Sequence, residues 1–121
     1  MEYMFLITMD DEAMAEPATA DPVSGSDAMA AWLAYNQKLI DGGHWISGGS
    51  LQSSASTTVV HKDAVGGTST TDGPYTESKE QVAGYYTVTA ADLDEALALA
   101  AEIPVQGAAI EVRPLMWRPD A

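Results

Sequence analysis

Two stretches of this chain carry apolar residues at helical spacing, and strand-like segments lie on both sides of each stretch. The first predicted helix begins near Ser26, which can cap its first turn, and ends at Gly42 and the glycine that follows it. The second begins with Asp92 and Glu95, whose spacing of three fits a capping box. The face of the first helix is apolar with one polar exception, Asn36, and consists of Met29, Trp32, Leu33, Asn36, Leu39 and Ile40.

The remaining ordered segments are predicted to be strands, because they alternate in polarity or are short apolar runs between turn residues. They are residues 2–9, 44–51, 57–62, 68–71, 82–89 and 109–113, with a hairpin turn around Asp63–Gly67 and a bulge or close backbone approach at Gly48–Gly49. No internal repeat or linker divides the chain, so residues 1–121 are expected to form one domain. The order of elements predicts an α+β two-layer sandwich of the ferredoxin-like βαβ type.

Two helices can cover only one face of such a small sheet, so the other face needs a different cover. That face is expected to carry some of the apolar strand residues Tyr3, Phe5, Ile7, Val59, Tyr85, Tyr86 and Ile110. Such a surface is too apolar to remain in water. The sequence therefore predicts a homodimer that forms through the open sheet face.

The charge of the chain limits its partners. Eighteen acidic residues against five basic ones give a formal net charge of −13. Direct binding to nucleic acid is excluded, because it requires Lys and Arg to neutralise phosphates, and docking on an anionic membrane is unfavourable for the same reason. A basic partner, a cation or a small molecule stays compatible with this charge. Residues 10–27 contain six of the acids and no base, and with Pro17, Pro22 and Gly25 they predict a long solvated loop.

The chain has no cysteine, which excludes disulfides, thiolate catalysis and cysteine metal sites. No apolar run approaches the roughly 20 residues of a membrane span. The start, MEYMFLITMDDE, has no basic leader and reads as a first strand rather than a signal peptide. A cytoplasmic location without membrane contact is expected.

The stretch from Thr71 to Tyr86, TDGPYTESKEQVAGYY, places charged residues beside a rigid turn and an apolar strand. Asp72 could orient a ligand or act as a base, but an Asp before Gly-Pro is also a turn former that bonds its own backbone. The three charged residues Glu77, Lys79 and Glu80 could bind a polar ligand at a pocket mouth or restrain the turn by ion pairs. A plain solvated turn is the alternative for the whole stretch.

This stretch resembles the signature of the DGPF branch of the YCII-related proteins, with DGPYTESKEQVAGYY at residues 72–86. MEYMFLI at the start, DLDEALALAAEIP at 92–104 and IEVRPL at 110–115 are also similar to that family, so the resemblance spans nearly the whole chain. The departures are Tyr75, where Phe is usual, and Ser78, where Thr is usual. The resemblance implies a ferredoxin-like fold that dimerises through its sheets into an α/β barrel with a cleft between sheet and helices.

The same resemblance implies two classes of function. Some relatives are small-molecule enzymes with a suggested His–Asp acid/base pair, whereas the DGPF branch is mostly without an assigned reaction. Some of its members are associated with extracytoplasmic-function sigma factors, which makes a regulatory or protein-interaction module the alternative. We expect binding or conversion of a small molecule near Asp72, and whether the chain is an enzyme stays open.

Residues for a His–Asp pair are scarce, since only His44 and His61 are present. Each could shuttle a proton if a carboxylate such as Asp72 or Glu80 lay within reach, or could be an ordinary surface or strand-edge histidine. Arg113 could bind a carboxylate ligand or pair with one of the many acids. The acidic run at residues 10–12 lacks calcium-loop spacing, and neither a metal site nor a cofactor is expected.

Overall fold

The computed structural model describes residues 1–10, 22–74 and 80–119 of the chain. Its elements follow the predicted order of strands and helices. They are β1 (Glu2–Asp10), α2 (Pro22–Asp41), β2 (Trp45–Ser50), the 3₁₀ turn η1 (Ser54–Ser56), β3 (Thr58–Lys62), β4 (Thr68–Asp72), β5 (Glu80–Thr89), α3 (Leu93–Ala101) and β6 (Ala108–Pro114).

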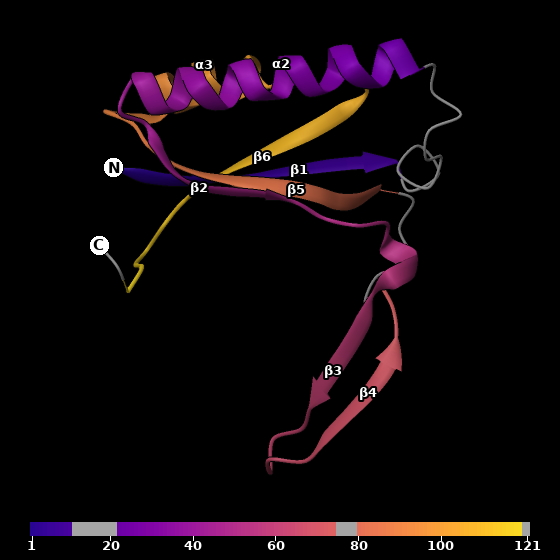
Figure 1. Cartoon of the computed structure of the whole chain (residues 1–121). Coiled ribbons are helices and arrows are strands. Elements are labelled where there is room, and N and C mark those ends of the chain that lie inside the picture. Colours follow the sequence, from indigo (N-terminus) through magenta and orange to yellow (C-terminus); the bar gives the residue numbers. More distant parts are fainter. Residues whose placement is uncertain (11–21, 75–79, 120–121) are drawn as a thin grey trace.

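Four strands form an antiparallel sheet in the order β2-β5-β1-β6. Both helices lie on the same face of this sheet (Figure 1). Helix α2 connects β1 with β2 while β5 lies between them, and α3 connects β5 with β6 while β1 lies between them. The chain is therefore an α+β protein with two split βαβ units, compatible with the predicted ferredoxin-like sandwich.

Helix α2 begins at Pro22, four residues before the predicted cap at Ser26. Proline is well tolerated in the first turn of a helix, because the N–H that it lacks has no partner there and its fixed φ suits the helix. The predicted loop is therefore wrong for residues 22–27, and residues 11–21 lie outside the described residues.

The end of α2 agrees with the prediction. Gly43 adopts a positive φ of 74°, which an L residue with a side chain rarely adopts. Its N–H donates to the carbonyl of Ile40 at 3.1 Å, and the N–H of His44 donates to the carbonyl of Leu39 at 2.8 Å. This is the hydrogen-bond pattern of a Schellman motif, and it turns the chain from the helix into β2.

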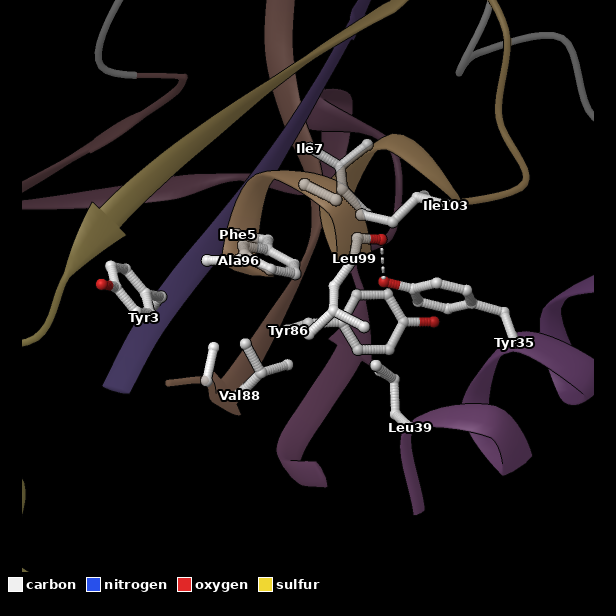
Figure 2. Close-up of a cluster of buried hydrophobic side chains, with 12 residues drawn as sticks. Tyr3, Phe5, Ile7, Tyr35, Leu39, Tyr86, Val88, Ala96, Leu99 and Ile103 are labelled. Atoms are coloured by element: carbon white, nitrogen blue, oxygen red, sulfur yellow. Dashed lines mark hydrogen bonds between the residues drawn. The ribbon is translucent and has the colours of Figure 1, made fainter. Parts of the chain in front are cut away.

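The core lies between the sheet and the helices (Figure 2). Strands β1 and β5 contribute its side chains on the sheet side, and α2 and α3 contribute those on the helix side. The Tyr35 hydroxyl of α2 donates to the carbonyl of Leu99 in α3 at 2.8 Å and so connects the two helices. Its buried large side chains are Tyr3, Phe5, Ile7, Tyr35, Leu39, Tyr86, Val88, Leu99 and Ile103.

This core changes the predicted composition of the open sheet face. Tyr3, Phe5, Ile7 and Tyr86 pack under the helices, and Ile110 packs against the same cluster. Because side chains alternate across a strand, Met4 and Leu6 of β1 face the other way, together with Tyr85, the register partner of Leu6. Of the residues expected on the open face, Tyr85 is the one on that side of the main sheet, while Val59 lies in a separate sheet.

That separate sheet is the predicted hairpin, formed by β3 and β4. It extends from the main sheet on the side away from the helices (Figure 1). Its turn is closed by Asp63, whose Oδ1 accepts from the N–H of Val65 at 3.0 Å and of Gly67 at 2.7 Å. Gly66 supplies the positive φ, 90°, that this turn requires.

Candidate functional site

A pocket of about 330 Å³ lies between α2 and the paired strands β2 and β5. It takes side chains from the apolar face of α2, from β2 at the sheet edge, and from the two central strands. The lining residues are Ile7, Met29, Trp32, Asn36, Trp45, Gly48, Gly49, Ser50, Ala83, Gly84 and Tyr86. Its volume falls at the small end of the range of pockets that hold small organic molecules.

Three aromatic rings define the pocket, and Tyr86 of β5 is the central one. Trp32 of α2 stacks on it, with ring centroids 6.2 Å apart and planes inclined by 17°. Trp45, at the start of β2, meets it edge-to-face at 6.0 Å and 76°. Behind it, Tyr35 contacts the same ring edge-to-face at 5.4 Å and connects the site to the core. Tyr86 is therefore held from several directions.

The polar end of the pocket is a hydrogen bond between Tyr86 and Asn36. The Tyr86 hydroxyl donates to Asn36 Oδ1 at 2.5 Å. Asn36 is the polar exception on the otherwise apolar face of α2. Its hydrogen bond with the Tyr86 hydroxyl offsets the cost of partly burying the amide at this position. Burial raises the pKa of Tyr86 to about 12. Burial, and then the neighbouring Tyr86 and Glu102, also raise the pKa of Tyr35. Both phenols are neutral at physiological pH.

The raised pKa predicts a pH dependence of stability. An unfolded tyrosine ionises near pH 10 whereas folded Tyr86 keeps its proton to about pH 12, so the unfolded state binds fewer protons across that interval. The free energy of unfolding should therefore be unaffected by this group below pH 10 and fall between pH 10 and 12, by on the order of 2 kcal/mol. Urea unfolding at a series of pH values measures the fall, and Tyr86→Phe should make it shallower. An equal slope in that variant would contradict the assignment.

Glycines allow the rings to approach the sheet. A Cβ on Gly48 would lie 2.9 Å from Tyr86 Cδ1 and 3.1 Å from Trp45 Cη2. The sequence predicted either a bulge or a close approach at Gly48–Gly49, and the structure shows the close approach. The bulge of this strand pair lies earlier, between Trp45 and Ser47.

Asp72 and Glu80, the charged signature residues that the structure describes, are not part of this lining. Asp72 ends β4 and Glu80 begins β5, and both are exposed. Glu77 and Lys79, the other members of the predicted cluster, lie outside the described residues. A ligand-binding role for these side chains stays a prediction.

The two histidines occupy different elements. His61 is exposed on β3, with Nε2 2.9 Å from the Thr71 hydroxyl on β4. His44 follows α2, with Nδ1 2.9 Å from the carbonyl of Thr89 and 3.8 Å from Glu95 Oε1. A carbonyl only accepts, so His44 Nδ1 carries a proton and donates to it. His44 thus joins the end of α2 to β5 and to the first turn of α3, and its catalytic role stays a prediction.

The predicted carboxylate-binding arginine, Arg113, is exposed on β6 opposite Met4. Arg118 is the arginine that contacts a carboxylate in the structure, since its Nε donates to both oxygens of Glu2 at 3.0 and 2.8 Å. This pair is not among the sites predicted from the sequence. A match between the two ends of the chain has no local signal in the sequence.

The described residues include no group of three or more His, Asp or Glu side chains that could hold a metal ion. None of the helices in that part of the chain combines the length and apolar character needed to cross a membrane. No charged side chain appears among the pocket-lining residues that the structure describes.

Two helices packed on one face of an antiparallel sheet, with a pocket between helix and sheet, define a class of small α+β proteins. Within that class, the chain belongs to the YCII-related domain family, whose model matches residues 1–117. An uncharacterized protein of Rhizobium meliloti (strain 1021) is 40% identical over 74 residues. This alignment covers 57% of each chain, so the matched part spans a little over half of that relative.

Proposed function

We propose that this protein binds a small organic molecule in the pocket between α2 and the β2–β5 pair. The observation that carries the proposal is the lining: three aromatic rings around about 330 Å³, with one hydrogen-bonded polar pair, Tyr86–Asn36, at its wall. Mostly apolar walls with a few placed polar groups are the usual composition of small-molecule sites. Trp32 and Trp45 keep part of their surface exposed, so a ligand can reach their rings.

The side chains of the same lining favour binding of a small molecule over its catalytic conversion. General acid–base catalysis needs a group that exchanges a proton near the working pH. Among the described lining residues, Tyr86 is the one with an ionisable side chain, and its pKa is raised to about 12. The residues Asp72, His61 and His44 would act in a reaction only if a ligand reached beyond this lining. A regulatory role, in which binding is sensed by a partner protein, is compatible with the same pocket.

The proposal predicts that Trp32 is needed for binding. A screen of small metabolites by thermal shift should give compounds that stabilise the protein, because a ligand that binds only the folded state raises its unfolding temperature. Trp32→Ala should abolish these shifts by removing one wall of the pocket. Trp117→Ala is the matched control, since Trp117 is 74% exposed and does not line the pocket. Shifts that persist in Trp32→Ala would place the binding elsewhere.

We also propose that two copies pair through the sheet face opposite the helices and form a dimeric α/β barrel. In the described part of the chain both helices lie on one face (Figure 1). The other face carries the large apolar side chains of Met4, Leu6 and Tyr85, with Glu111 and Arg113 of β6 beside them. Pairing would remove these apolar side chains from water. The pocket lies on the helix side, so pairing would leave it accessible. The cytoplasmic location expected from the sequence stays a prediction.

The dimer has a direct test in solution. Light scattering at micromolar concentration should give twice the 12.7 kDa of one chain. Leu6→Glu should give a monomer, because its carboxylate would lie beside that of its register partner Glu111 in the middle of the paired faces. Leu97→Glu on the exposed side of α3 is the control and should remain dimeric. A monomeric mass for the unmodified chain would contradict the proposal.

A further inference from the structure

We infer that the pocket between α2 and the β2–β5 pair selects organic cations: a compact substituted ammonium group attached to a flat apolar body. The inference rests on the proposed function, that this pocket binds a small molecule, and it names the chemical class of that molecule. Aromatic rings, the charge of the lining and the orientation of the Tyr86 hydroxyl each support it.

The rings supply the attraction. The face of an aromatic ring carries negative potential, and a cation within about 6 Å of the ring centroid is stabilised, most strongly by tryptophan. The centroids of Trp32 and Trp45 lie 6.2 and 6.0 Å from that of Tyr86. One ammonium group in the pocket can therefore lie within range of more than one ring. The flat body of the ligand then stacks on the remaining apolar wall.

The lining disfavours anions. An anion that leaves water for a site without a cationic partner loses hydration that nothing replaces. No Lys, Arg or His is among the described residues of the lining. Lys38 and Arg118 are already bound to carboxylates, Glu102 and Glu2. The net charge of −13 adds a long-range field that attracts cations and repels anions.

The Tyr86 hydroxyl is oriented so that its oxygen can face a bound cation. The Tyr86 hydroxyl directs its proton to Asn36 Oδ1 at 2.5 Å, so the lone pairs of its oxygen are left as acceptors. The rings and this oxygen thus present negative charge density. A neutral ligand of the same shape would gain only the apolar contact.

Three probes of one shape and different charge test the inference: phenyltrimethylammonium, tert-butylbenzene and benzenesulfonate. Each carries a tetrahedral group on a phenyl ring. Binding is followed by tryptophan fluorescence in the full chain with Trp117→Phe, which removes the exposed tryptophan outside the pocket. Phenyltrimethylammonium should bind about tenfold more tightly than tert-butylbenzene, in the range of a partly desolvated cation–π contact. Benzenesulfonate should give no saturable change.

Trp32→Leu separates the ring from its apolar area, because leucine keeps an apolar contact but has no π face. In this variant, with Trp45 as the reporter, the preference for the cation should fall to about twofold. A preference that stays near tenfold in Trp32→Leu would come from diffuse attraction to the acidic chain and would overturn the inference. Equal binding of tert-butylbenzene and phenyltrimethylammonium would overturn it while leaving the proposed pocket function intact. Failure of all three probes to bind would count against the pocket function as well.

Discussion

Phe5→Ala should lower the free energy of unfolding by about 3–5 kcal/mol, the usual cost of removing a fully buried phenylalanine. Phe5 has no exposed surface and lies at the centre of β1, between its register partners Tyr86 and Val112. The loss combines the transfer of the ring to water with the cavity that it leaves under the helices. Since domains of this size are stable by about 5–15 kcal/mol, the variant should be only marginally folded.

Chemical denaturation followed by circular dichroism measures this loss. Leu97→Ala is the matched control, because Leu97 is 48% exposed on the outer side of α3 and its removal leaves no cavity. We expect its effect to stay below about 1 kcal/mol. Equal losses for the two variants would show that the core is not centred on β1. Phe5→Leu, which retains most of the apolar volume, should restore much of the stability.

Gly84→Ala should destabilise the fold by about 3 kcal/mol, although it adds only one methyl group. The added Cβ would lie 2.9 Å from the carbonyl oxygen of Gly49, a backbone atom of the neighbouring strand. That contact is too short for any real Cβ, and backbone held in a sheet ladder moves only if the pairing of β2 with β5 changes. The variant should therefore lose both stability and the shape of the pocket, which Gly84 lines.

Gly49→Ala is the matched control for this prediction. The three atoms nearest to its added Cβ would all belong to the Tyr85 side chain, at 3.0–3.3 Å, and a side chain can rotate away. Replacing a strand glycine by alanine also restricts the unfolded chain, which contributes about 0.4–1 kcal/mol in its favour. Thermal unfolding of the two variants compares them directly. A Gly49→Ala protein less stable than Gly84→Ala would contradict the argument.

The main elements could be predicted from the sequence because each has a local signal. The helical spacing of apolar residues predicts both helices. The pair Asp92–Glu95 predicts the start of α3, where the Glu95 N–H donates to Asp92 Oδ1 at 2.9 Å. The predicted start of α2 is wrong, because Pro22 stands in the first turn of the helix, where proline is tolerated, rather than in a loop before it. The face on which a strand residue lies is not a local property. Tyr85 and Tyr86 are neighbours of the same type, and only the register with β1 shows which one is buried.

The pocket was missed for a related reason. The charged residues from Asp72 to Glu80 have side chains that suggest a polar site, whereas the pocket is made of aromatic residues that suit a hydrophobic core equally well. Trp32, Trp45 and Tyr86 come from three separate elements and meet only after α2 docks on the sheet. Two signals were present in the sequence. Asn36 interrupts an apolar helix face, and two adjacent glycines follow Trp45 by three residues.

The β3–β4 hairpin is constrained differently from the strands β2 and β5 on either side of it. All residues from 61 to 70 are exposed, and the β3–β4 pairing is a sheet of its own. Changes of length or sequence at its tip therefore remove no contact of the core. In contrast, residues of β2 and β5 line the pocket and pair with each other in the main sheet, so changes there would alter both. The tip of the hairpin can thus vary widely in length and sequence without altering either the core or the lining of the pocket.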